Sequence, residues 1–425
     1  MKLASYWHET AKAFVGGREG PVGGHCDVAV IGGGFTGLSA ALALAKRGAK
    51  VTLVEAGRVG GEASGRNGGH CNNGLSADFR GAAERLGLPL ARSLYRAFDA
   101  AVDTVERIVR EEKIDCDFKR NGKIKLAAKP EHFDNLARSY EFMAREVDPD
   151  TDLVPPSAIK SEIGSDGFHG GLVYRKSGQM HMGKFVAGLA SAASRHGTAI
   201  YESAPVSQLR RIVGRKHEVV TGRGSFTADQ VFLATGTSMR GPFFHFRRRI
   251  IPVGSFIIAT QPLSENVLGD LMPTRRTATT TRYIGNYFRI SPDNRLVFGG
   301  RARFALSSPT SDAKSGRILE KGMLSLFPQL RGVSIDYCWG GLVDMTADRL
   351  PRAGEHEGLL YSMGYSGHGT QMSVHMGQVM AEVMNGRADA NPLRELDWPA
   401  IPGHFGPPWF LPFVGAYYRM KDWLH

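Results

Sequence analysis

A glycine-rich turn between a strand and a helix is the feature that most constrains this fold. Residues 27–31 form a short apolar run typical of a buried parallel strand. Residues 38–48 have the composition of a helix that ends at Gly48, and residues 50–55 return to strand. The first strand and the helix are joined by a turn of G-x-G-x-x-G type, Gly32-Gly33-Gly34-Phe35-Thr36-Gly37. We therefore predict a right-handed βαβ unit.

The spacing of these glycines favours a bound dinucleotide. The first glycine of the pattern makes the turn, the second lets the backbone approach a diphosphate, and the third lets helix and strand pack closely. The diphosphate lies on the helix N-terminus, where free N–H groups and the helix dipole favour an anion. The alternative is a tight turn without a ligand. Glu55, 18 residues after Gly37, is placed to bind a ribose hydroxyl and to disfavour a 2′-phosphate, which indicates NAD or FAD.

Two further glycine clusters help to choose between these dinucleotides. One follows Glu55 and the other lies between a strand-like run and a helical run: Ala63-Ser64-Gly65-Arg66-Asn67-Gly68-Gly69-His70 and Gly364-Tyr365-Ser366-Gly367-His368-Gly369-Thr370. Taken alone, the first cluster has a flexible surface loop as its less favoured alternative, whereas the second is as well explained by another tight turn. Together they suit a long cofactor, with one loop beside it and a helix N-terminus that stabilises an anionic reduced ring at its far end. The three clusters favour FAD over NAD.

Segments of α/β character frame an antiparallel middle. Strand and helix patterns alternate near both ends of the chain, whereas residues 251–301 have the pattern of antiparallel strands with a hairpin turn at 291–294. We predict an α/β fold with a Rossmann-like FAD-binding domain and an inserted α+β substrate domain containing a large antiparallel sheet. The expected parts are an N-terminal arm at 1–24, a discontinuous FAD-binding domain at 25–80, 150–240 and 340–395, a substrate domain at 81–149 and 241–339, and a C-terminal extension at 396–425.

Composition narrows the class of partner. The 53 Lys and Arg residues exceed the 41 Asp and Glu residues, giving a formal charge of +12, which suits nucleic acid, an anionic membrane surface or an anionic substrate. The arginine clusters at 210–211, 247–249 and 275–276 lack an aromatic ladder, so we expect no nucleic acid and attribute the charge to an anionic substrate. Four cysteines without metal-ligand spacing predict a reducing compartment and no metal.

The chain has no apolar window of signal-peptide or membrane-spanning length, so we expect a cytoplasmic protein without a transmembrane segment. The apolar run at 409–414 is broken by proline, and we expect it to pack at an interface. The oligomeric state stays open.

From residue 27 to about residue 420 the chain resembles the D-amino-acid-oxidase-like (DAO) FAD amine oxidoreductases, the family that includes sarcosine and glycine oxidases. Within it, the likeness is greatest to the γ-glutamylputrescine oxidases of bacteria. Besides the first two glycine clusters, the resemblance rests on four motifs: Phe298-Gly299-Gly300, Ile335-Asp336-Tyr337-Cys338-Trp339, Arg349-Leu350-Pro351 and Ser366-Gly367-His368-Gly369. It implies a GR2-type FAD-binding domain.

The resemblance also implies which residues hold FAD. The ADP half would contact Gly32, Gly34, Phe35, Thr36, Gly37, Glu55 and Ala56, with the backbone of Val206 at the adenine. The pyrophosphate, ribityl chain and ring would run beside Ser64, Arg66, Asn67, Gly68 and Gly69, and Ala234-Thr235-Gly236 would pass close to the cofactor. Gly367, His368, Gly369 and Thr370 would reach the ring and ribityl chain.

Two positions depart from the family pattern. Sarcosine oxidases tether the flavin through a cysteine just before a T-x-D stretch like residues 346–348, where this chain has Gly341; Cys338 lies three residues away. We therefore expect non-covalent FAD. His70 stands where the γ-glutamylputrescine oxidases, as we align them, have Gln, which leaves the substrate open.

The chemistry implied is hydride transfer from the carbon next to an amine nitrogen to flavin N5, giving an imine, with O2 reduced to H2O2. The protein would orient the C–H bond, favour the neutral amine and shield the ring. The predicted catalytic or substrate-lining residues are His70, Tyr287, Arg289, Arg301, Trp339 and Tyr365.

Each of these residues also has a structural alternative. Trp339 and Tyr365 equally suit core packing, and His70 equally suits a structural hydrogen bond. Arg289 and Arg301, on opposite limbs of the predicted hairpin, are able to clamp a carboxylate, although solvated strand positions are the more common reading.

Three functions remain open from the sequence. The substrate is a small amine or amino acid, either an open-chain γ-glutamylated diamine or a cyclic secondary amino acid such as L-pipecolate. The third possibility is a dehydrogenase that passes electrons to a quinone or a carrier protein in place of O2.

Overall fold

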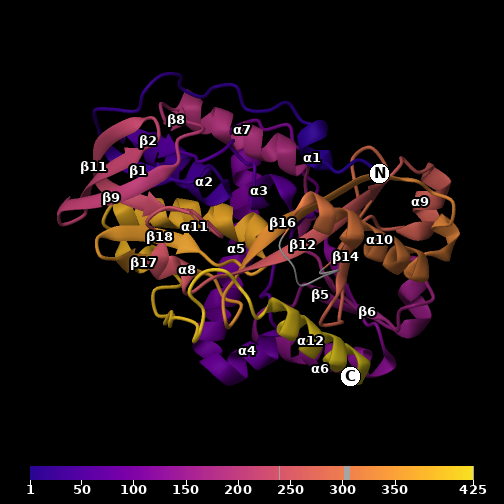
Figure 1. The fold of residues 1–425 in the computed structure, drawn as a ribbon. Helices are drawn as coiled ribbons and strands as arrows, with labels where there is room; N and C mark the ends of the chain where they lie inside the picture. Colours follow the sequence, from indigo (N-terminus) through magenta and orange to yellow (C-terminus); the bar gives the residue numbers. More distant parts are fainter. Residues whose placement is uncertain (239, 301–306, 425) are drawn as a thin grey trace.

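The computed structural model describes residues 1–238, 240–300 and 307–424, and two large sheets lie side by side in it (Figure 1). The first contains the predicted βαβ unit. β1 (His25–Ile31) pairs in parallel with β2 (Val51–Val54) and with β11 (Gly224–Leu233). The strand order is β17-β18-β11-β1-β2-β8, and a hairpin of β9 and β10 joins through β11. The other strands are β8 (Ala199–Tyr201), β9 (Val206–Val213), β10 (Lys216–Thr221), β17 (Arg352–His356) and β18 (Leu359–Met363).

Helices from three distant segments cover one face of this sheet. They are α2 (Phe35–Ala45), α7 (Met182–Arg195) and α11 (Gly369–Met384), and α5 (Leu88–Glu111) packs against α11. Every residue of α2 is buried, because its small side chains allow close packing. A Cβ atom added at Gly377 of α11 would lie 2.5 Å from the carbonyl oxygen of Thr36, so the two helices touch through backbone.

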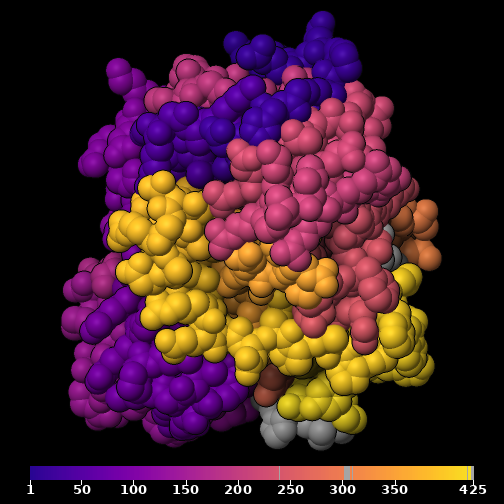
Figure 2. Space-filling view, turned by 90° about the vertical axis from the view of Figure 1, so that its left-hand side faces the viewer, coloured from indigo at the N-terminus to yellow at the C-terminus, as the bar shows by residue number. Residues whose placement is uncertain are grey.

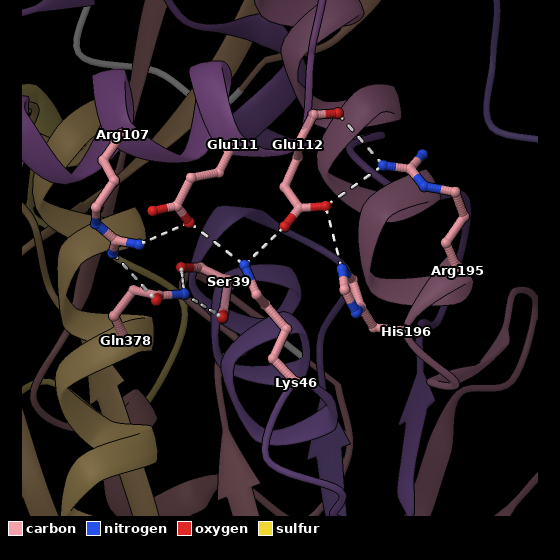
Figure 3. A network of polar contacts seen from close by, with 8 residues as sticks. All are labelled: Ser39, Lys46, Arg107, Glu111, Glu112, Arg195, His196 and Gln378. Atoms are coloured by element: carbon pink, nitrogen blue, oxygen red, sulfur yellow. Dashed lines mark hydrogen bonds and ion pairs between the residues drawn. The ribbon is translucent and has the colours of Figure 1, made fainter.

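A polar network fastens the far ends of these helices (Figure 3). Lys46, which follows α2, donates to Glu111 (3.3 Å) and Glu112 (2.9 Å) at the end of α5. Glu112 also accepts from Arg195 and His196 at the end of α7, and the Gln378 amide of α11 donates to the carbonyl oxygen of Ser39 in α2 (2.8 Å). The network therefore holds α2 in place from the end opposite to its glycine turn.

The second sheet is largely antiparallel, with the order β16-β12-β15-β14-β13-β4-β6-β5. It confirms the predicted hairpin, because β14 (Asn286–Ile290) and β15 (Leu296–Gly300) pair across the turn at 291–294. Helices α9 (Glu265–Leu271) and α10 (Pro309–Leu326) contribute to its own hydrophobic core. The other strands are β4 (Lys123–Leu126), β5 (Thr151–Val154), β6 (Gly171–Tyr174), β12 (Ile251–Thr260), β13 (Thr277–Thr280) and β16 (Ile335–Met345).

The division between the sheets differs from the expected boundaries at residues 150 and 340. Because β5 and β6 pair with each other and β6 pairs with β4, the segment from 151 to 174 adds to the second sheet. β16 pairs with β12 along its whole length, so residue 340 lies inside a strand of that sheet. The smaller elements are α1 (Tyr6–Glu9), α3 (Ala63–Arg66), α4 (Phe79–Leu86), α6 (Pro130–Glu146), α8 (Phe244–Arg247), the β3–β7 pair (His70–Cys71 and Gly178–Gln179), and 3-10 turns at Pro156–Ser161, Pro328–Leu330 and Ala388–Ala390.

The N-terminal arm is not free of the body of the protein. Lys2 pairs with Tyr337 on the outer edge of β16, and the side chains of Tyr6 and Trp7 in α1 are fully buried. Two large aromatic rings within a polar segment supply the apolar area for this attachment.

The C-terminal segment lies across one side of the molecule (yellow in Figure 2). It is joined to α8 and its neighbours by backbone hydrogen bonds, such as Ile401 N to Arg248 O (2.9 Å), and it ends in α12 (Leu411–Leu424). The apolar run expected at an interface leaves Trp409 and Phe413 exposed at 68% and 71%. Among the described residues, none of the helices is both long and apolar enough to cross a bilayer.

Candidate active site

The three glycine clusters meet in the structure. The backbone N–H of Phe35 donates to Ser64 Oγ (3.0 Å), which joins the first cluster to the second. The hydroxyl of Thr370 donates to Asn67 Oδ1 (3.3 Å), which joins the second to the third. The hydroxyls of Thr36 and Tyr365 lie 2.9 Å apart and link the third to the first. Segments more than 300 residues apart therefore form one site, as the FAD hypothesis requires.

The glycines of the first turn lie so close to neighbouring backbone atoms that side chains do not fit there. Gly32 has φ +115°, and a Cβ atom there would lie 2.5 Å from the carbonyl oxygen of Ala234. A Cβ atom at Gly37 would overlap the carbonyl oxygen of Gly32. The N-cap residue of α2 is Gly34, which has no side chain to cap the helix, and the first turn holds no acidic residue; Ser64 Oγ accepts only from the N–H of Phe35. The helix N-terminus is therefore built to receive an anion from outside the chain.

Glu55 lies beside this turn, at the end of β2. Its carboxylate accepts from the backbone N–H groups of Gly33 (2.7 Å) and Gly57 (2.8 Å). Burial raises the Glu55 pKa above its ordinary value, and these two hydrogen bonds oppose that shift. The backbone oxygen of Glu55 accepts from Ala204 N (2.8 Å), which brings the loop before Val206 to the same edge. Ala56 follows directly, and residues 234–236 continue from the neighbouring β11.

The second loop is held by its own side chains and by the second sheet. The Asn67 amide donates to Ser64 O (2.9 Å), and Asn67 Oδ1 accepts from Gly69 N (2.9 Å). Arg66 Nε donates to Gly340 O (2.6 Å), and the Trp339 indole donates to Arg66 O (2.8 Å). β16 thus fastens this loop from the side of the second sheet.

The third cluster has an acceptor that the sequence reasoning missed. The Asp344 carboxylate, on β16, accepts from Gly364 N (2.7 Å) and so fixes the turn before α11. Burial raises the pKa of Asp344 to about 6, against several backbone N–H groups that lower it. The sequence did contain a sign of this buried acceptor, because Asp344 is the one carboxylate within the apolar stretch 342–345. Gly364, Ser366 and Gly367 all have positive φ, between +54° and +89°.

Beyond the second loop, His70 and Tyr287 face one another. Their ring centroids are 5.5 Å apart, and the Tyr287 hydroxyl lies 3.0 Å from Ser255 Oγ. The backbone of Phe288 hydrogen-bonds the His70 ring, whereas Nε2 is buried without a partner among the residues described. Desolvation and the nearby Arg289 charge lower the pKa of His70 to about 3, so its imidazole is neutral at neutral pH.

A buried lysine near this pair also escaped the sequence reasoning: Lys123 of β4 is 5% exposed. Its ammonium donates to Asn73 O (2.7 Å) and lies 4.1 Å from the centre of the Tyr174 ring. Desolvation lowers the pKa of Lys123 to about 7. Charged and apolar residues alternate in 123–126, a pattern typical of a half-exposed strand, yet the Lys123 side chain is enclosed, with the ring of Tyr174 from the neighbouring β6 against it.

Three of the predicted substrate-lining side chains are instead packed inside the protein. Arg289 is 1% exposed and donates to the carbonyl oxygens of Gly69 (2.6 Å) and Met180 (2.9 Å), so it is not available to clamp a carboxylate. Trp339 is buried, and its indole N–H donates to the carbonyl oxygen of Arg66. The Tyr365 hydroxyl is hydrogen-bonded to the hydroxyls of Thr36 and Ser362. For both aromatic residues the core alternative is the observed one. Arg301 lies outside the described residues.

A scan against protein-family models matches residues 27–383 to the family described as DAO, FAD dependent oxidoreductase. The chain belongs to the DAO family. This confirms the resemblance drawn from the glycine clusters, and with it the enzyme class and the FAD cofactor.

Relatives of this DAO-family chain agree with the assignment. The chain is 33% identical over 406 residues to the γ-glutamylputrescine oxidoreductase of Escherichia coli (strain K12), covering 94% of this chain and 93% of the relative. The crystal structure of L-proline dehydrogenase from P. horikoshii has a TM-score of 0.70 at 20% identity, covering 92% and 99% of the two chains. Glycine oxidase from Geobacillus kaustophilus has a TM-score of 0.69 at 24% identity, covering 90% and 98%. The two structures confirm the predicted fold.

The residues present fit FAD. The backbone cradle at Gly32 and Gly37 leaves no room for side chains, and the N-cap residue of α2, Gly34, has no side chain to cap the helix. The second and third glycine clusters are hydrogen-bonded to this turn and to each other. A diphosphate at the start of α2 and a ring beside the second and third clusters suit this arrangement.

Proposed function

We propose that this DAO-family enzyme is an oxidase of a carboxylate-bearing amine of the γ-glutamylputrescine type. Its 33% identity across nearly the whole length of the E. coli γ-glutamylputrescine oxidoreductase supports this substrate class.

The observation that carries the proposal is the neutral His70 beside Tyr287. Because the backbone of Phe288 hydrogen-bonds the ring and Nε2 is left unpaired, we assign the proton to Nδ1 and the lone pair to Nε2. A lone pair there is suited to accept a hydrogen bond from an amine N–H. The nearby Arg289 charge, which helps to lower the pKa of His70, also disfavours a further positive charge in the pocket and so favours the neutral form of the amine.

FAD, when bound, supplies the two-electron acceptor for oxidation of the C–N bond to an imine, and O2 is the proposed final acceptor, forming H2O2. The ADP half would be held by the Gly32–Gly37 turn and Glu55, and the ring by residues 64–69 and 367–370. The role of the chain at the substrate is to orient the amine against Tyr287 and His70 and to exclude water.

We also propose that FAD is held without a covalent bond. Gly341 offers no thiol, and the Cys338 side chain is fully buried and donates to the carbonyl oxygen of Asp312 (3.3 Å), on the α10 side of the sheet. Acid precipitation of the flavoprotein should release all flavin to the supernatant; flavin that stays with the precipitate would contradict this.

The deciding experiment is anaerobic reduction of the bound flavin. γ-Glutamylputrescine should bleach the visible flavin band, L-pipecolate should not, and admitting air should restore the band with formation of H2O2. Bleaching by L-pipecolate alone would replace the substrate class by a cyclic secondary amino acid. Slow recovery in air but fast recovery with a quinone would make the enzyme a dehydrogenase.

A further inference from the structure

Three side chains of the N-terminal segment bind the backbone of the second glycine loop. Each donates to a carbonyl oxygen between residues 60 and 67: Ser5 Oγ to Gly65 (3.3 Å), Trp7 Nε1 to Asn67 (2.7 Å) and His8 Nε2 to Gly60 (3.2 Å). The N-terminal segment therefore lies along the loop and is hydrogen-bonded to its backbone at three points.

Trp7 is the centre of this arrangement. Its side chain is fully buried, and the Arg289 guanidinium lies 5.3 Å from its ring centre. Because Arg289 in turn donates to the carbonyl oxygen of Gly69, Trp7 supports the loop at Asn67 directly and at Gly69 through Arg289. This also explains why a buried arginine is tolerated: two carbonyls and an aromatic face surround its charge.

The other contacts of the segment anchor it to both sheets. Lys2 exchanges backbone hydrogen bonds with Asp336 and Cys338 at the edge of β16. The Tyr6 hydroxyl is hydrogen-bonded to Asp293 in the hairpin turn of the second sheet. On the side of the FAD-binding domain, the Thr10 hydroxyl lies 2.9 Å from His181 Nε2 at the start of α7. A segment held at both ends in this way is able to transmit rigidity to the loop.

We infer that residues 5–8 are a positioning segment that holds loop 60–69 in the conformation that receives FAD, with Trp7 as its principal residue. This inference rests on the assignment of loop 64–69 to FAD. A loop already ordered before binding loses less conformational freedom when the cofactor arrives, so the segment increases FAD affinity without touching FAD.

The test is Trp7→Phe, which keeps most of the buried ring and removes the indole N–H. The matched control is Trp398→Phe, because the Trp398 indole N–H is buried without a partner in the described chain while its ring packs on Tyr361 (5.3 Å). FAD affinity is measured by titrating the apoprotein and following quenching of flavin fluorescence. We expect the Kd for FAD to rise about tenfold in Trp7→Phe and to change less than about twofold in the control.

Two further readouts separate positioning from general stability. The shape of the visible flavin band, recorded with saturating FAD, should change in Trp7→Phe and not in Trp398→Phe, because only the former alters the backbone beside the ring. Ser5→Ala removes only the hydrogen bond to the carbonyl oxygen of Gly65 and should also raise the Kd for FAD. This variant replaces Trp7→Phe in the test if Trp7→Phe does not fold. An unchanged Kd and band in Trp7→Phe with a lowered apoprotein Tm would overturn the inference. Failure of the unmodified protein to bind FAD would instead reject the cofactor assignment.

Discussion

The ring of Tyr287 stands edge-on to the imidazole of His70, with the ring planes inclined at 81°. Tyr287 belongs to β14 of the second sheet, and His70 follows the second glycine loop of the FAD-binding part. The pair therefore lies where the two parts of the molecule meet. A substrate bound between a flavin on one part and a sheet on the other would contact both.

His70 is expected to act through its unpaired Nε2. His70→Leu, which removes the acceptor, should lower kcat/KM about 10- to 100-fold with FAD affinity little changed, because a lost hydrogen bond to a reacting group costs about 1.5–3 kcal/mol. His70→Gln restores a polar acceptor and should recover much of the loss. Steady-state kinetics with the amine identified by flavin bleaching measures both variants. Equal activity of His70→Leu and the unmodified enzyme would make His70 a packing residue.

Glu55 is expected to contribute to FAD affinity and little to the fold. Glu55→Gln keeps the shape of the side chain but loses the charge that accepts from Gly33 and Gly57 and from a ribose, so the Kd for FAD should rise about 10-fold or more. The control is Glu202→Gln, whose carboxylate also accepts from a loop N–H, that of Val59 (2.7 Å). The Kd for FAD of both apoproteins is measured by fluorescence titration. An equal rise in the Kd of the two variants would assign Glu55 a general structural role.

Gly37 has no space for a methyl group. Gly37→Ala forces its Cβ atom into the carbonyl oxygen of Gly32, so we expect the free energy of unfolding of the apoprotein to fall by about 1–3 kcal/mol and FAD binding to be largely lost. Gly81→Ala is the matched control, because Gly81 lies in α4 with nothing within 4 Å of an added Cβ atom. It should be neutral or stabilising by up to about 1 kcal/mol in urea unfolding. A stable, FAD-binding Gly37→Ala protein would contradict the geometry of the turn.

Acid should destabilise the apoprotein partly through His181, which is buried at the start of α7. Desolvation, with help from Lys184 and Arg289, lowers the His181 pKa from 6.5 to about 4. Between these values the unfolded chain binds the proton more readily, so the stabilising contribution is complete above pH 6.5 and is lost as the pH falls toward 4. At pH 5 the loss from this one group is about 2 kcal/mol.

His181→Asn tests this expectation, because asparagine keeps an acceptor for the N–H of Lys184 at the helix N-cap and does not titrate. Its free energy of unfolding should depend less steeply on pH between 6.5 and 4 than that of the unmodified apoprotein. Parallel slopes for His181→Asn and the unmodified apoprotein would show that His181 is not the group responsible.

The features that could be predicted are those in which a short segment constrains its own conformation. The Gly32–Gly37 turn lies between β1 and α2 as expected, and the turn at 291–294 joins β14 and β15, because each depends on nearby glycine, proline and apolar positions. The meeting of the three glycine clusters was also predicted, since a long cofactor requires all three in one place.

The assignment of charged and aromatic side chains could not be predicted in the same way. Alternation along β14 says that Tyr287 and Arg289 share one face of the strand, but it does not say what covers each of them. Tyr287 faces His70, whereas Arg289 is enclosed by Gly69, Met180 and Trp7. One face of one strand thus supplies both a substrate-facing candidate and a buried support.

The sequence by itself determined the βαβ unit, the FAD cofactor and the DAO family, because glycines at fixed spacing leave the backbone few alternatives. Only the tertiary structure decided that the N-terminal arm is hydrogen-bonded to the second glycine loop, that Arg289 is buried and that β5 and β6 belong to the second sheet. The physical reason is distance along the chain: Arg289 and the carbonyl it binds are separated by 220 residues. Burial and hydrogen bonding between such segments depend on how the sheets pack, and no local pattern encodes that packing.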